Sequence, residues 1–102
     1  EKAERVAVLP VDIQWADVGN WASLKRLLPH DEHGNAIRGE ALLLDCQNNL
    51  VFADKRLIAA IGLEDFVVVD TPDALLICHK DRVQEVRQVV ERLKADGRQE
   101  LI

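Results

Sequence analysis

The stretch WADVGNW at residues 15–21 contains the residue types of this chain that are best suited to chemistry. Asp17 and Gly19 lie between the chain's two tryptophans. The β-branched run at residues 5–11 predicts a buried strand just before them, so Asp17 would lie at a carboxyl strand end, where open α/β sheets bind ligands and metals. A short carboxylate there suits Mg²⁺, which takes one or two protein carboxylates and completes its coordination with phosphate and water. Gly19 would allow a tight turn and the close approach of a ligand.

A second interpretation of this stretch requires no chemistry. Asp17 would help to cap the following helix, and the two tryptophans would belong to the core. Asn20 occupies an N-cap position, and apolar residues follow it at helical spacing until Pro29. Spacing alone favours this second interpretation, because short motifs are weak indicators of function.

The composition limits the function classes that fit the chain. Its 102 residues, 48% apolar and 30% charged, predict one ordinary globular domain. The net charge of −5 gives no basic stripe for nucleic acid, and no apolar run approaches the roughly 20 residues of a membrane span. Cys46 and Cys78 lack metal-ligand spacing, so we expect reduced thiols. Because the chain contains no Met, we interpret it as a piece of a longer protein.

The middle of the chain shows short apolar segments at intervals of eight or nine residues. This rhythm predicts a compact all-β unit, which would be a meander, a small sandwich or coils of a β-solenoid. Residues 42–55 can be laid over residues 67–80 without a gap, so that Leu50 matches Leu75, and a further strand candidate at 57–61 lies between the two copies. Two hairpins of equal length would give the same match by coincidence.

The last third of the chain predicts a helix. Asp81 would cap it, and the Asp96–Gly97 pair would end it. One face is apolar and consists of Val83, Val86, Val89, Val90 and Leu93. We interpret this face as core packing, because a domain of this size needs every apolar stripe that it has.

Over essentially its whole length, the chain resembles the C-terminal portion of bacterial mannose-1-phosphate guanylyltransferases. The residues that carry the resemblance are Glu1-Lys2, the run at 6–11, WADVGNW, His33-Gly34-Asn35 with Gly39, and the runs at 61–65, 67–71 and 73–75. In this family the Asp of the W-x-D-x-G turn is a ligand of the catalytic Mg²⁺, and this role falls on Asp17. Ala16 and Asn20 stand where Ser is more usual, but the carboxylate and the glycine are present.

The resemblance also implies an architecture. We expect an α+β, mainly β fold with short left-handed β-helix-like coils, preceded by a strand, turn and helix and followed by a C-terminal helix. Residues 1–36 would be the end of the nucleotidyltransferase domain, and residues 37–102 would be the β-helix-like linker domain. The family's Gly-rich nucleotide loop, guanine pocket and first metal-binding Asp belong to an N-terminal half that this sequence does not contain.

Two functions follow as expectations. The first is part of a cytoplasmic, Mg²⁺-dependent guanylyltransferase that makes GDP-mannose from GTP and mannose 1-phosphate, with Asp17 as the catalytic and metal-binding residue and Gly19 beside the cofactor. The isolated chain would be inactive, because phosphoryl transfer depends on positioning the phosphates. The second is a non-catalytic assembly module that packs against the missing half or a second copy. We expect a homo-oligomer, and neither nucleic acid nor a membrane as a partner.

A last expectation concerns the N-terminal segment. Residues 1–28 would normally lie against the missing sheet, so Trp15 and Trp21 would lose their cover in the isolated chain. Exposed apolar surface of that size is unfavourable, so the strand at 6–11 would either be mobile or pair with another copy through strand exchange.

Overall fold

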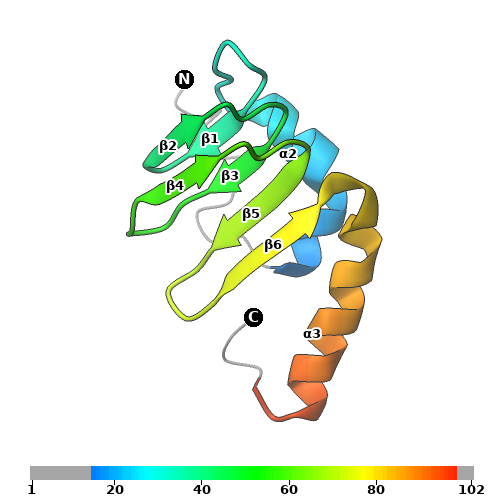
Figure 1. Ribbon diagram of the computed structural model, residues 1–102. Helices are drawn as coiled ribbons and strands as arrows, with labels where there is room; N and C mark the ends of the chain where they lie inside the picture. The colour runs from blue at the N-terminus through cyan, green and yellow to red at the C-terminus, as the bar shows by residue number, and fades with distance from the viewer. Residues whose placement is uncertain (1–14, 99–102) are drawn as a thin grey trace, which may run out of the picture.

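The computed structural model of the protein describes residues 15–98 (Figure 1). The expected strand at 6–11 lies outside the described residues. In chain order the elements are the 3-10 helix η1 (Trp15–Asn20), helix α2 (Trp21–Leu27), strands β1 (Ala36–Arg38), β2 (Ala41–Leu44), β3 (Leu50–Phe52), β4 (Ile58–Ile61), β5 (Phe66–Asp70) and β6 (Leu75–His79), the 3-10 helix η2 (Lys80–Glu85) and helix α3 (Val86–Ala95).

The strands form stacked coils of a β-helix. One sheet has the order β1-β3-β5-β6, and its first three strands are parallel, while β2 and β4 form a second parallel pair. Three parallel pairings join residues 17 positions apart: Leu50 with Val67, Ala41 with Ile58, and Gln47 with Glu64. The parallel β1–β3 pair joins residues 14 positions apart, as Ala36 with Leu50. Parallel pairings on several sides of the stack indicate coils, so the β-solenoid alternative is confirmed, and the expected strand at 57–61 is β4. The left-handedness of the coils stays a prediction.

The repeat proposed from the sequence is wrong in its register. It placed Leu50 opposite Leu75, a step of 25 positions, whereas Leu50 pairs with Val67. The physical reason is the turn that follows β5, where the Thr71 N–H and hydroxyl both donate to the Ala74 carbonyl at 2.9 Å. This turn sends β6 back antiparallel to β5, so β6 is a hairpin partner and not a strand of a further coil.

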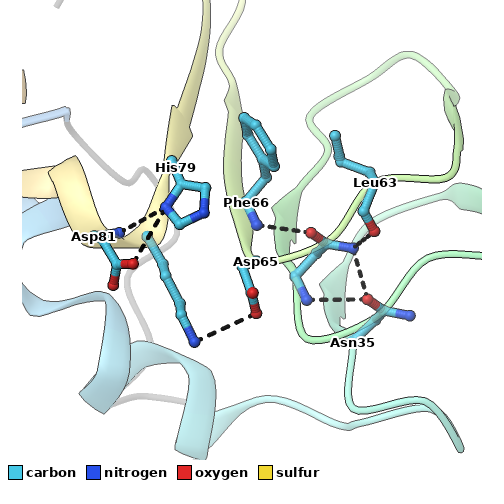
Figure 2. A network of polar contacts seen from close by, with 8 residues as sticks. Asn35, Leu63, Asp65, Phe66, His79 and Asp81 are labelled. Carbon is cyan, nitrogen blue, oxygen red and sulfur yellow. Dashed lines mark hydrogen bonds and ion pairs between the residues drawn. The ribbon is translucent and has the colours of Figure 1, made fainter.

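A buried asparagine ladder holds one corner of the coils together (Figure 2). Asn35 and Asn49 are each 0% exposed and directly precede β1 and β3. The Asn35 Oδ1 accepts hydrogen bonds from the backbone N–H and side-chain Nδ2 of Asn49, and the Asn49 Oδ1 accepts one from the Phe66 N–H at 2.8 Å. The Asn49 Nδ2 also donates to the Leu63 carbonyl at 2.8 Å. Each coil therefore satisfies polar groups of the next, as buried polar groups require.

The hydrophobic core lies between the four-stranded sheet and the helices. Alternate strand residues divide between the two faces of this sheet, as the period of two requires. The helical side consists of Leu50, Phe52, Val67, Val69 and Leu76, packed with Trp15, Val18, Leu24, Leu28, Ala36, Val83, Val86 and Val90. Val51 and Val68 are buried outside this cluster. Figure 1 shows α2 and α3 on one side of β3 and β5, away from β2 and β4.

The expectation that Trp15 would lose its cover is wrong. Trp15 is 5% exposed and Trp21 is partly buried, because the chain's own core includes Trp15 and packs against Trp21. The core takes residues from both sides of the expected boundary between 36 and 37, and the division into two domains there stays a prediction.

Of the two helix caps expected from the sequence, the position of Asn20 is confirmed and the capping role of Asp81 is wrong. Asn20 precedes α2 but makes no side-chain capping hydrogen bond. At the C-terminal helix, the Asp81 N–H donates to the Nδ1 of His79 at 3.1 Å, so the cap is His79 and it begins η2 rather than α3. The predicted end is confirmed, since Gly97 has a φ of 75° and the Arg98 N–H donates back to the Leu93 carbonyl.

Candidate metal-binding turn

The Asp17 stretch folds as a 3-10 helix that leads directly into α2. Side chains three residues apart lie above one another in such a helix. Trp15 and Val18 follow this spacing and are 5% and 0% exposed, whereas Asp17 and Gly19 are exposed. Trp15 therefore belongs to the core, as the second interpretation expects, while Asp17 is exposed and its metal role stays a prediction.

The C-terminal helical segment packs against this turn. Trp15 and Val18 share the core with Val86 and Val90 of α3. A pocket of about 80 Å³ lies between the turn and this segment, and its lining consists of Trp15, Gly19, Val83, Gln84, Val86, Arg87 and Val90. In Figure 1, the blue η1 segment lies beside the start of α3.

Gly19 does not serve the tight turn that its sequence context predicts. Its φ is not positive, and a Cβ built on it would meet only the Nε2 of Gln84, at 4.0 Å. Gly39 is the contrasting case, with a φ of 92° and a Cβ position that would overlap the Ala53 carbonyl oxygen. The described part of the chain therefore gives no conformational or packing reason for glycine at position 19, and an external group that approaches Asp17 would supply one.

The donor set fits one ligand of a hard cation, not a complete site. Among residues 15–98, no group of three or more His, Cys, Asp or Glu side chains could hold a metal ion. Mg²⁺ needs only one or two protein carboxylates, because water and phosphate oxygens complete its octahedral shell. An exposed carboxylate in a short rigid turn therefore matches a partial contribution to such a shell.

A second polar cluster follows the β5–β6 hairpin and was missed in the sequence (Figure 2). The Nζ of Lys80 lies 3.3 Å from Asp65, and the rings of Phe66 and His79 meet edge to face with centroids 5.4 Å apart. The Nδ1 of His79 also lies 3.7 Å from the Asp81 carboxylate. These contacts join the end of β6 to the start of β5, so we interpret this cluster as structural.

The asparagine ladder was also missed, although the sequence contains a signal for it. Each of the two buried asparagines directly precedes a short apolar run, at Asn35-Ala36 and Asn49-Leu50. Asp31 caps the ladder, because its Oδ1 accepts the Asn35 N–H and its Oδ2 accepts the Asn35 Nδ2, both at 2.9 Å. Desolvation raises the pKa of Asp31, but the hydrogen bonds from Asn35 and from the His33 N–H outweigh it, so its pKa lies below the ordinary value.

Both cysteines are free thiols that act as small packing groups. Cys46 is buried, and its Sγ donates to the carbonyls of Leu44 and Ala60. Burial raises the pKa of the Cys78 thiol, with a further contribution from Glu85, so it stays protonated at neutral pH. Within residues 15–98, no helix has the length and apolar character that crossing a membrane requires.

Comparison with known proteins gives the turn its context. The chain is 47% identical over 100 residues to the alginate biosynthesis protein AlgA of Pseudomonas aeruginosa, and 44% identical over 102 residues to mannose-1-phosphate guanylyltransferase 2 of Escherichia coli O157:H7. These matches cover 98% and 100% of this chain but 21% of each relative, so the chain spans about a fifth of the length of the curated relatives it matches.

A solved structure supports the same assignment. The crystal structure described as a mannose-1-phosphate geranyltransferase from Thermus thermophilus superposes with a TM-score of 0.66 at 39% identity, covering 76% of this chain and 24% of that one. The family model of the MannoseP isomerase/GMP-like beta-helix domain matches residues 39–93, which include all strands from β2 to β6. The chain belongs to the MannoseP isomerase/GMP-like beta-helix domain family, and its stacked parallel coils agree with this assignment.

Proposed function

We propose that this chain works as part of a Mg²⁺-dependent mannose-1-phosphate guanylyltransferase. The reaction is the attack of a mannose 1-phosphate oxygen on the α-phosphorus of GTP, which yields GDP-mannose and releases pyrophosphate. The observation that carries the proposal is the η1 turn, where the Asp17 carboxylate is exposed while Trp15 and Val18 fix the turn in the core. The names of the relatives, which include mannose-1-phosphate guanylyltransferases of Escherichia coli, support the same reaction.

The roles of the chain's own residues follow from this geometry. Asp17 would supply one carboxylate oxygen to Mg²⁺, and Gly19 would leave the adjacent surface low enough for a phosphate to approach. When bound, the cation neutralises charge on the phosphates during transfer. The sequence contains no G-x-G and no phosphate loop, so the phosphate cradle would come from an N-terminal catalytic half. The cytoplasm is the compartment proposed for this reaction.

A comparison of the isolated chain with the completed protein tests this proposal. The chain alone should show neither GTP binding by calorimetry nor pyrophosphate release, and adding the N-terminal half should restore release when Mg²⁺ is present. Turnover by the chain alone would contradict the proposal, and so would a completed protein that releases no pyrophosphate from GTP and mannose 1-phosphate.

A second candidate function is assembly, and one surface favours it. The outer face of β2 and β4 exposes Leu42, Leu44 and Ile61, which are 55%, 52% and 76% exposed. Exposed apolar residues that are contiguous on one face are typical of contact surfaces. If two copies of the chain associate through this face, Ile61→Lys should lower the mass observed by sedimentation. Val89→Lys is the control, because Val89 lies on α3 and is 42% exposed, and it should leave the mass unchanged. Equal masses for wild type and both variants would rule out this face as the contact between copies.

A further inference from the structure

The turn that carries Asp17 cannot hold its own position. Runs of 3-10 helix are short and have poor hydrogen-bond geometry, and a six-residue helix is marginal in water. Its position is therefore set by its buried side chains, Trp15 and Val18, and by the surface on which they rest.

That surface belongs in large part to the C-terminal helix. Val86 and Val90 lie one turn apart on α3, are 4% and 8% exposed, and share the core cluster with Trp15 and Val18. Val89 lies beside Val90 in sequence but on a different side of the helix, and it is 42% exposed. Only one stripe of α3 is therefore available to support the turn.

We infer that α3 positions Asp17 for the cation, with Val86 and Val90 acting as positioning residues through Trp15 and Val18. This inference rests on the proposed function. The helix that follows the coils thus contributes to the metal turn that precedes them, although neither valine carries a group that could bind a ligand. The pocket beside Trp15 and Gly19 leaves the turn room to move when the support is weakened.

The first test uses the metal-free whole protein and measures hydrogen exchange at the amides of residues 17–20. Val90→Ala removes the support and should speed this exchange on the order of tenfold, since truncating a core side chain weakens local packing. Val89→Ala is the matched control on the same helix, and Val51→Ala is a control at a buried valine outside the core cluster. Neither control should change exchange at these four amides relative to the rest of the protein. Val90→Ile keeps the contact and should behave as wild type.

The second test measures binding of Mn²⁺, as a spectroscopic substitute for Mg²⁺, to the whole protein with GTP and without mannose 1-phosphate. Val90→Ala should weaken Mn²⁺ binding roughly tenfold, the usual effect of losing a group that orients a ligand. Val51→Ala should leave the affinity unchanged even where it lowers thermal stability as much as Val90→Ala does.

The outcomes separate this inference from the function on which it rests. If Asp17→Asn abolishes Mn²⁺ binding while Val90→Ala and Val51→Ala bind alike and exchange alike, the proposed function stands and the positioning role of α3 is wrong. If Asp17→Asn binds Mn²⁺ as wild type does, the metal role of Asp17 fails first. Faster exchange and weaker binding confined to Val90→Ala, together with normal behaviour of Val90→Ile, would support the inference.

Discussion

The asparagine corner of the coils and the η1 turn differ in the burial and hydrogen bonding of their polar groups. At the corner, Asn35 and Asn49 are fully buried and hydrogen-bonded from coil to coil. At the turn, the Nε1 of Trp15 is buried without a hydrogen-bond partner among the described residues, and Asp17 directs its carboxylate outward. The polar groups of the corner are satisfied within the coils and stabilise the fold. The turn instead presents an exposed carboxylate to its surroundings.

The largest expected effect on stability tests the asparagine corner. Asn49→Ala removes three side-chain hydrogen bonds and leaves the Phe66 N–H without a partner, while the Asn35 Oδ1 keeps the Asn49 backbone N–H and the Leu63 carbonyl keeps the Gln47 N–H. An unsatisfied group costs about 1–3 kcal/mol and each of the two other lost hydrogen bonds about 0.5–1.5 kcal/mol, so we expect a loss of about 2–6 kcal/mol in the free energy of unfolding. Urea denaturation of the chain would measure it, with the exposed Gln47→Ala as the control, expected within about 0.5 kcal/mol of wild type. A small effect for Asn49→Ala would show that the corner does not hold the coils together.

The next effect compares two glycines of the coils that both have a positive φ. Gly39→Ala would place a Cβ against the Ala53 carbonyl oxygen, whereas Gly62→Ala would meet nothing within 4 Å. The strained backbone conformation costs both variants about 1–2 kcal/mol, and the clash adds roughly 1–3 kcal/mol to Gly39→Ala alone. Thermal unfolding of the two variants side by side would measure the difference. Equal melting temperatures would contradict the close packing between these coils.

The smallest effect concerns the pH dependence of the ladder's cap. Because hydrogen bonds hold the pKa of Asp31 below its unfolded value, its contribution to stability is present above about pH 4 and disappears as the pH falls through the folded pKa. In the Asp31→Asn variant, the free energy of unfolding should therefore depend less on pH in that acidic range. Urea midpoints at several pH values between about 2.5 and 6 would measure this. A variant that loses as much stability as wild type over the same range would show that other carboxylates dominate the acid response.

The parts of the fold that local sequence patterns determine could be predicted. The parts that depend on the pairing register of distant strands could not. Apolar strands, the positions of the breaks and the end of α3 follow from residue types alone, and the resemblance supplied the β-helix itself. The register was missed because a step of 25 positions and a step of 17 both align apolar runs, and only the Thr71–Ala74 turn decides between them. The ladder was missed because its hydrogen bonds join residues 14 and 17 positions apart.

The sequence and the resemblance single out Asp17 as the candidate residue of the site, and its metal role stays a prediction, whereas the support of its turn was not predicted. Asp17 could be singled out from its spacing to Gly19, but one of the two reasons given for that glycine, the tight turn, was wrong, and the close approach of a ligand stays a prediction. The cover of Trp15 was also missed, because the pattern of α3 shows that it has an apolar face but does not identify what that face covers. Val89 was placed in that face by its spacing and is largely exposed.

The most direct test of the metal role of Asp17 is pyrophosphate release by the whole protein, proposed to be a guanylyltransferase, with Asp17→Asn at saturating Mg²⁺, measured beside Asp54→Asn, a change at an exposed aspartate of the β3–β4 loop. The amide keeps the shape of the side chain and removes its charge, so the account predicts an unchanged fold and a loss of pyrophosphate release by orders of magnitude for Asp17→Asn alone. Wild-type turnover by Asp17→Asn would contradict the account, because the turn would then carry no ligand of the cation.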